Sequence, residues 1–243
     1  MPSPSHRHTA PPRALDLPPP FRLITLREAG NAFAHAQAIA ATEGAGTLVH
    51  VGRFDVAELA VVLEPEQPLR TARRAIYAGL VALADALAVA APPEKPISFD
   101  WPDAVLVDGG VVGGARLAWP ENAGEDAPGW LVFGATIRLV AMTADEPGLH
   151  PLSATLAEEG FRDFGADRLT ESFARHLMVA IDAWQDSGFS AIAKAYLSRL
   201  PGEGMTIDDT GDLLVRSAGG AIERRDLRGA LAAPGWLRRG GFS

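Results

Sequence analysis

Apolar residues recur along this chain with two spacings, and each spacing predicts a different kind of element. Residues 28–42 and 71–90 place apolar side chains on one side of a helix, and further helices are predicted at 167–184 and 190–200. Short runs that are apolar, or that alternate between apolar and polar side chains, predict β-strands. We predict such strands at 21–26, 47–51, 59–63, 97–101, 104–107, 111–117 and 130–142.

The order of these elements predicts an α+β fold. Paired strands separated by helices indicate a mixed or antiparallel sheet flanked by helices, and they argue against a doubly wound parallel sheet. The dipeptide Asp108-Gly109 lies between two predicted strands and is typical of a tight hairpin turn. Residues 52–55 are predicted to form a loop, and Gly188 is predicted to separate the last two helices.

The two ends of the chain differ from its middle in proline content and in the length of their apolar runs. Residues 1–20 are rich in proline and predict an extended or disordered arm. After Pro201, short apolar runs around Ile207, 213–215 and Ile222 predict a small C-terminal β domain with a tail, over 201–243. The predicted main domain therefore covers 21–200.

Composition and charge exclude several classes of function. The chain has 243 residues, a net charge of -8 and no cysteine. An acidic chain repels phosphate backbones, so we expect no nucleic-acid partner, and the lack of cysteine excludes disulfides and thiol chemistry. No apolar run approaches the roughly 18–20 residues of a membrane span, so a cytoplasmic protein without a membrane partner is expected. His6 and His8 lack further ligands, and no metal site is predicted.

A central hairpin carries the resemblance to a known family. The sequence from Phe99 to Gly109, which includes Trp101-Pro102-Asp103, is followed by Val112-Gly113-Gly114. This stretch resembles the hairpin of biotin protein ligases, which reads Lys-Trp-Pro-Asn-Asp, an apolar strand, a turn, a lysine, and an apolar residue before Ala-Gly or Cys-Gly. Further similarity lies in 132–138, in the helices around Trp184 and Tyr196, and in 207–216. From Phe21 onward the chain looks most like the biotin/lipoate A/B protein ligase-like proteins of alphaproteobacteria.

The resemblance implies a fold and a reaction. It implies a class II synthetase-like sheet with a small C-terminal β domain. It also implies ATP-dependent attachment of biotin or lipoate, with Mg²⁺, to a lysine of a biotin or lipoyl carrier domain. In that account Trp101, Pro102, Gly113 and Gly114 line the pocket of the acyl group. Gly113-Gly114 could instead relieve a tight strand crossing, and Trp101 could be a core residue.

The chain departs from the family pattern at the charged positions. Asp100 and Val111 stand where the family has lysines, Asp103 replaces its asparagine, and Ala104 replaces the following aspartate. The family's Gly-Arg-Gly-Arg-Arg-Gly loop should lie between the second and third strands, where only residues 52–55 are present. A carboxylate at a position that should bind an anion would repel it.

Three arginines are candidates to replace the missing lysines. Arg53 lies in the short loop, Arg116 follows the glycine pair, and Arg138 takes the place of a family asparagine. Arginine stays charged and can bind a carboxylate or phosphate through two parallel hydrogen bonds. Each could also be an ordinary partner in a surface salt bridge. Asp100 and Asp103 could orient the incoming amine or a Mg²⁺ ion, or could be solvated or capping carboxylates.

Three hypotheses follow for the function. The preferred one is an enzyme that attaches biotin, lipoate or another small carboxylic acid, with Asp100, Asp103 and Arg116 as catalytic candidates and Arg53 and Arg138 as anion anchors. The second is a non-catalytic protein that binds the cofactor or its carrier on the same scaffold. The third is a subunit whose site is completed by another chain. The absence of cysteine disfavours acyl transfer through a cysteine thioester.

Overall fold

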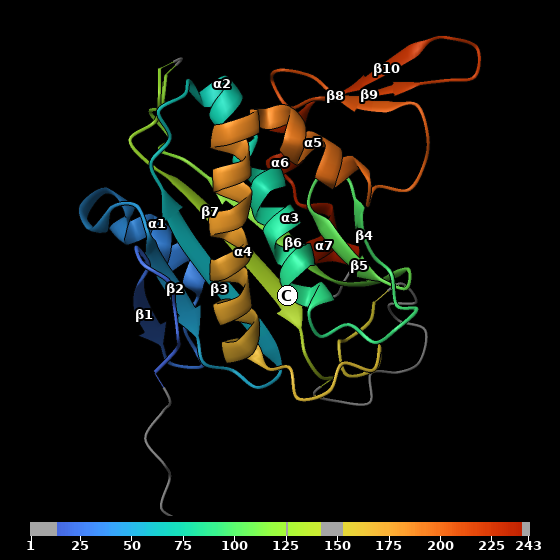
Figure 1. The fold of residues 1–243 in the computed structure, drawn as a ribbon. Coiled ribbons are helices and arrows are strands. Elements are labelled where there is room, and N and C mark those ends of the chain that lie inside the picture. Colours follow the sequence, from blue (N-terminus) through green and yellow to red (C-terminus); the bar gives the residue numbers. More distant parts are fainter. Residues whose placement is uncertain (1–13, 125, 142–152, 240–243) are drawn as a thin grey trace, which may run out of the picture.

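A mixed sheet of seven strands runs through the described part of the chain, which comprises residues 14–124, 126–141 and 153–239 of a computed structural model (Figure 1). The strand order is β1-β2-β3-β7-β6-β5-β4. Strands β1 and β2 are parallel, and every other neighbouring pair is antiparallel. The strands are β1 (Arg22–Leu26), β2 (Thr47–Val51), β3 (Val56–Leu63), β4 (Ile97–Asp100), β5 (Ala104–Val107), β6 (Gly110–Ala118) and β7 (Leu131–Arg138).

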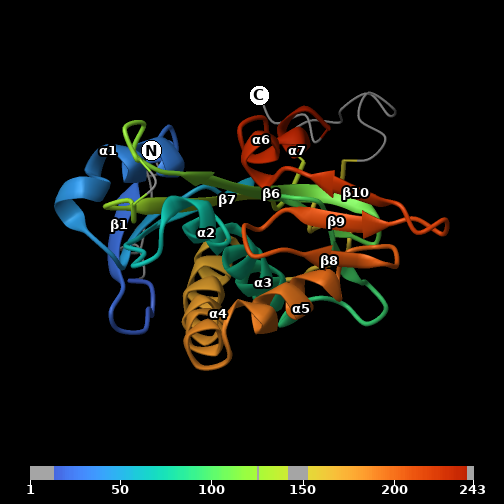
Figure 2. The same cartoon turned by 90° about the horizontal axis from the view of Figure 1, so that it is seen from above.

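Helices cover both faces of this sheet (Figure 2). One face carries α3 (Ala75–Ala88), α4 (Ala166–Ser187) and α5 (Phe189–Leu197). The opposite face carries α1 (Ala32–Glu43) and two short helices near the C-terminus, α6 (Leu227–Leu231) and α7 (Gly235–Arg239). A short helix α2 (Leu69–Ala72) precedes α3. The two faces therefore offer separate environments for a site.

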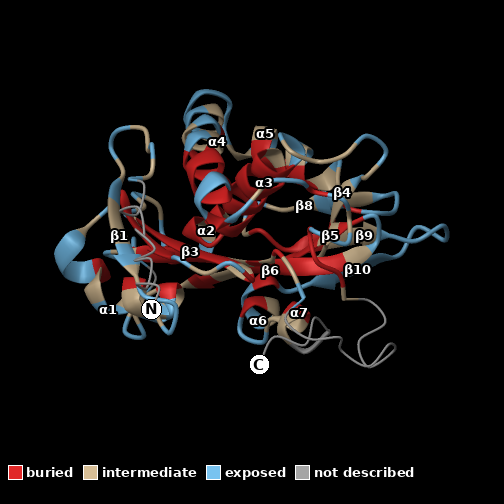
Figure 3. Cartoon of the chain, turned by 90° about the horizontal axis from the view of Figure 1, so that it is seen from below, coloured by how far each residue is buried: buried red, intermediate tan, exposed pale blue. Residues whose placement is uncertain are grey.

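The core lies between the sheet and the helices α3 and α4 (Figure 3). Helix α3 is buried on nearly every side because it lies between the sheet and α4, which explains its almost continuous apolar sequence. Phe133 of β7 and Phe173 of α4 stack in this core with their ring centroids 5.6 Å apart. Gly79 of α3 makes room for Phe133, because a Cβ atom there would lie 2.2 Å from its ring.

A second, three-stranded antiparallel sheet follows α5. It consists of β8 (Met205–Ile207), β9 (Leu213–Arg216) and β10 (Ile222–Arg225), in the order β10-β9-β8. Leu213 and the two leucines that bound α6 are buried in the same core cluster as α3. The C-terminal residues thus share the hydrophobic core of the preceding ones.

The predicted fold class is confirmed, and several elements have the predicted bounds. Strands β2 and β5 occupy the positions read from the sequence. The turn between β5 and β6 has positive φ at Asp108 (49°) and Gly109 (84°), as a two-residue hairpin turn requires. Gly188 ends α4 with a φ of 75°, a conformation that side-chain-bearing residues rarely adopt.

Other elements differ from the prediction because of particular hydrogen bonds and caps. The helix predicted at 71–90 is two helices, because Arg74, Ile76 and Tyr77 donate their N–H groups three residues back in a tighter turn. Strand β7 ends at Arg138, since the N–H groups of the next two residues bond the Asp55 carbonyl at 2.8 and 3.2 Å. The predicted C-terminal tail contains α6 and α7. The side chain of Asp226 caps α6 by accepting a hydrogen bond from the Gly229 N–H.

Some predictions fall outside the described residues. They include most of the arm at 1–20 with His6 and His8, and the end of the strand predicted to reach residue 142. Residues 14–20 of the arm form no helix or strand. Within the described ranges, no helix combines the length and apolar character that a membrane crossing demands.

Candidate functional site

Two of the three candidate arginines lie on the sheet face that carries α1 and α7. Strand alternation sends Ile137 of β7 into the core, so its neighbour Arg138 points to the other face. Arg116 of β6 pairs with Gly134 and lies on that same face, where it contacts Phe33 of α1. We call this surface, defined by Glu58, Gly114, Arg116, Thr136 and Arg138, the arginine face.

Arg116 is held by an aromatic ring. Its guanidinium lies 4.4 Å from the ring centroid of Phe33. Phe33 can lie there because Gly134 has no side chain, since a Cβ atom at Gly134 would be 2.4 Å from the ring. Burial lowers the pKa of Arg116, and the nearby Glu58 opposes that change. The guanidinium forms no hydrogen bond or ion pair with any other described residue, so its donors remain open to a ligand.

Glu58 joins the arginine face to helix α1. It is 8% exposed, and its Oε1 accepts a hydrogen bond of 2.8 Å from the Ala32 N–H at the start of the helix. A carboxylate at this end of a helix is favoured by the unpaired N–H groups and by the helix dipole. Glu58 therefore places α1, and with it Phe33, relative to Arg116.

The other two candidate arginines already have partners. Arg53 binds Asp55 through two hydrogen bonds of 3.0 and 2.6 Å, which raises the pKa of Arg53 and lowers the pKa of Asp55. Arg138 donates a hydrogen bond to the Ser153 hydroxyl. The structure thus brings Arg116 and Arg138 to one face, and it leaves Arg53 in the β2–β3 loop engaged with a neighbouring carboxylate.

Trp101 of the Trp-Pro element lies on the side of the sheet that carries α3, α4 and α5. Trp101 packs against the main core, and its Nε1–H donates to the Tyr77 hydroxyl at 2.9 Å. Tyr77 in turn donates to the Gly211 carbonyl at 2.6 Å, and Tyr196 donates to the Pro102 carbonyl at 3.0 Å. The indole of Trp101 is therefore held by α3 rather than by the arginine face, and its predicted role as a pocket wall stays a prediction.

The two candidate carboxylates sit on either side of this element. Asp100 ends β4 and is partly buried, while Asp103 is 1% exposed. The backbone carbonyl of Asp103 accepts a hydrogen bond of 2.8 Å from the Ala115 N–H, which ties it to β6. Their roles toward an amine or a metal ion stay predictions. Among residues 14–124, 126–141 and 153–239, no group of three or more His, Asp or Glu side chains is placed to hold a metal ion.

The glycine pair is needed for close packing on both faces. A Cβ atom at Gly113 would lie 2.0 Å from the Thr136 carbonyl oxygen, and one at Gly114 would lie 2.5 Å from the indole of Trp236. Trp236 of α7 is fully buried, and its Nε1–H donates to the Ala115 carbonyl at 3.0 Å. The space beside Gly114, predicted to receive a ligand, is thus filled by a C-terminal side chain.

Sequence reasoning missed Trp236 and Phe33 as parts of this site. Phe33 falls within the helix predicted at 28–42, and Trp236 falls within the predicted C-terminal tail. The spacing of Leu227 and Leu231, four residues apart after the capping residue Asp226, could have revealed a helix in that tail. No local pattern shows that Trp236 would reach β6.

The mixed seven-stranded sheet with helices on both faces, followed by a small antiparallel sheet, is the fold of the biotin protein ligases. Residues 17–198 match the model of the biotin/lipoate A/B protein ligase family, and the chain belongs to that family. A biotin–[acetyl-CoA-carboxylase] ligase of Paracoccus denitrificans is 29% identical over 185 residues, which cover 66% of this chain and 73% of the relative.

Solved structures share the fold. A biotin protein ligase-like protein of unknown function from Silicibacter sp. has a TM-score of 0.77 and 27% identity, and the match covers 88% of this chain and 97% of that one. The biotin protein ligase of Aquifex aeolicus has a TM-score of 0.67 and 16% identity, over 84% of this chain and 95% of that one. At that identity the second likeness concerns the fold alone.

Proposed function

We propose that this protein binds a carboxylic acid of the biotin or lipoate type on the arginine face and attaches it, with consumption of ATP, to a lysine of a biotin or lipoyl carrier domain. Family membership and the biotin ligase relative support the reaction class. The observation that carries the assignment of the site is the open guanidinium of Arg116.

The environment of Arg116 suits a carboxylate. Phe33 covers one side of the guanidinium and restricts its orientation, while its N–H donors are not used by other described residues. Arginine binds a carboxylate through two parallel hydrogen bonds, and such bonds are stronger where water is partly excluded. Arg138 on the same face adds positive charge, while Glu58 is tied to the start of α1 and is 8% exposed.

The reaction needs an activated carboxylate, because a lysine amine does not displace the oxygen of a free carboxylate. ATP would supply the leaving group, and pyrophosphate would be the measurable product of that activation. The positive charge available to a nucleotide on this face comes from arginine alone. Lys95 is bound to Asp108 and Glu159 at 2.6 and 2.9 Å, and Lys194 lies on α5 beyond the opposite face.

A second candidate is binding without chemistry, and two observations favour it. Val111 and Asp100 stand where the resembling ligases have lysines, and Trp236 occupies the space beside Gly114. Such a protein would hold the acid or its carrier domain without consuming ATP. A related alternative is that a second polypeptide completes the site.

Pyrophosphate release in the presence of ATP, Mg²⁺ and biotin, lipoate or octanoate tests these candidates. We expect release with at least one acid, and Arg116→Ala should weaken the response to that acid by roughly tenfold or more, since it removes charge-assisted bonds. Arg116→Lys should restore part of it, because the charge remains while the paired donor geometry is lost. The control Arg216→Ala, at an exposed arginine on β9, should behave as the unaltered protein.

Each outcome has a defined meaning. Calorimetric binding of an acid without pyrophosphate release would replace catalysis by the second candidate. Release that needs an added cell extract would point to a completing subunit. Binding of none of the three acids, or equal binding by the Arg116→Ala variant, would overturn the assignment of the arginine face.

A further inference from the structure

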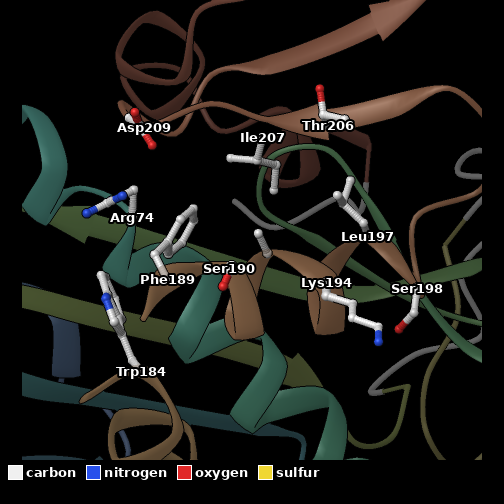
Figure 4. A pocket seen from close by; sticks show the side chains of 11 residues that line it. Arg74, Trp184, Phe189, Ser190, Lys194, Leu197, Ser198, Thr206, Ile207 and Asp209 are labelled. Atoms are coloured by element: carbon white, nitrogen blue, oxygen red, sulfur yellow. The ribbon is translucent and has the colours of Figure 1, made fainter. Parts of the chain in front are cut away.

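A cavity of about 770 Å³ lies on the other side of the main sheet, between α4, α5 and the small C-terminal sheet (Figure 4). Trp184 and Phe189 line it from the helices, and Ile207 and Asp209 line it from β8 and the turn that follows. This volume falls within the range of about 300–1,000 Å³ that small-molecule sites occupy. None of the residues that define the arginine face lines this cavity.

An aromatic pair and a cation form one wall. The ring centroids of Trp184 and Phe189 are 5.4 Å apart, and the Arg74 guanidinium lies 4.4 Å from the Phe189 centroid and 5.7 Å from that of Trp184. Both rings are only partly buried. They therefore offer apolar, flat surface beside a positive charge, an arrangement that suits a planar ligand with an anionic group.

The charges of the lining favour an anion. Arg74 uses its Nε for the Thr71 carbonyl and its Nη2 for Gln67, both at 2.9 Å, and its Nη1 bonds no other described residue. Lys194 also lines the cavity, and in Figure 4 it lies on the opposite side from Arg74. Asp209 is the one carboxylate of the lining. Two cations against one carboxylate stand out in a chain whose net charge is -8.

The wall that carries Arg74 is pre-formed. The Cγ of Arg74 packs on Gly211, where a Cβ atom would lie 3.1 Å from it and 2.7 Å from Leu227. The turn that carries Asp209 is held by the Asp208 side chain, which accepts hydrogen bonds from the N–H groups of Thr210 and Asp212 at 2.9 and 3.0 Å. A site that is already ordered loses little entropy when it binds.

We propose that this cavity is a second binding site, distinct from the arginine face, for a planar organic monoanion such as an aromatic carboxylate. The ring of the ligand packs against Trp184 and Phe189, and its carboxylate meets the open Nη1 of Arg74. The site lies across the main sheet from Arg116, because α4 and α5 cover the face opposite to α1 and α7 (Figure 2). Occupancy therefore does not depend on ligase activity.

Calorimetry with 1-naphthoate as the probe, without ATP, tests the proposal on the full chain. We expect 1-naphthoate to bind, the neutral 1-naphthamide to bind at least about tenfold more weakly, and Arg74→Gln to weaken naphthoate by a similar factor. Trp184→Leu, at the edge of the cavity, should weaken naphthoate and naphthamide alike, because both share the ring. Arg216→Gln serves as the matched control for the loss of one positive charge outside the cavity.

One further variant and a folding control make the outcome decisive. Arg116→Ala should retain naphthoate binding, and loss of binding in that variant would assign the probe to the arginine face and overturn this proposal while supporting the first. Circular dichroism checks that the Arg74→Gln variant is folded. If Arg74→Gln does not fold, Trp184→Leu still tests the cavity independently. Equal affinity for naphthoate and naphthamide, or unchanged naphthoate binding in both cavity variants, would also overturn the proposal.

Discussion

Replacement of Trp236 by alanine tests the most consequential contact of the arginine face. Trp236 is fully buried against Gly114, belongs to a cluster with Ala104 and Val111, and donates a hydrogen bond to the Ala115 carbonyl. Truncation of a buried tryptophan removes its contacts and leaves a cavity, which costs about 3–5 kcal/mol of unfolding free energy. For a chain of this size, that corresponds to a fall in Tm of roughly 10 °C.

A companion variant separates the ring from the hydrogen bond. Trp236→Phe keeps most of the apolar contact and removes the Nε1–H donor, so it should cost about 1–2 kcal/mol. Urea unfolding followed by far-ultraviolet circular dichroism measures both variants, because the loss of one of five tryptophans complicates fluorescence. Ile222→Ala, at a side chain that is 55% exposed, is the control and should change stability by less than about 0.5 kcal/mol.

A cost below about 1 kcal/mol for Trp236→Ala would contradict the burial of this indole, since a residue that covers the sheet beside Gly114 must contribute more than that. In that case α7 would not be docked in solution, and the space beside Gly114 would be open to a ligand. Such a result would remove one of the two observations that favour binding without catalysis.

Two further predictions concern stability. Gly79→Ala gains about 1 kcal/mol of helix propensity. It also places a Cβ atom 2.2 Å from the buried ring of Phe133, and such overpacking costs about 1–3 kcal/mol. The urea midpoint of unfolding should therefore fall, and a higher midpoint would contradict this account. Burial lowers the pKa of His50 below its ordinary 6.5, although Asp167 at 3.0 Å opposes this. The unfolded chain then binds the proton more readily, so stability should be full above about pH 6.5 and decline as the pH falls below it. Unfolding midpoints at pH 7.5 and 5.5 should differ less in His50→Gln than in the unaltered protein, and an equal difference would exclude His50 as the source.

Local patterns were sufficient for most of the secondary structure. The apolar runs of β2 and β5 and the Asp108-Gly109 turn are short-range features, and their bounds or position agree with the structure. Where distant segments determine an element, prediction was poorer. Strand β7 ends early because its next N–H groups bond Asp55, which lies more than 80 positions earlier. The turn between α2 and α3 was also missed, although its backbone bonds reach only three residues back, because apolar periodicity does not reveal them.

The candidate site shows the same division. Arg116 and the glycine pair could be selected from the hairpin pattern, and Arg138 from the resemblance of residues 132–138 to a family strand, because both depend on neighbouring residues. The roles of Phe33 and Trp236 could not, since each reaches β6 or β7 from a helix far away in the sequence. The pairing of Arg53 with Asp55 is local, but both residues could equally have faced a ligand.

By itself, the sequence determined the α+β fold class, the order of the strands along the chain and the family resemblance, because these depend on the spacing of apolar residues and on short motifs. Only the tertiary structure decided which arginine keeps open donors, that the indole of Trp236 covers Gly114, and that a charged aromatic cavity lies across the sheet. The physical reason is that apolar spacing states which face of an element is buried. It does not state which distant side chain buries that face.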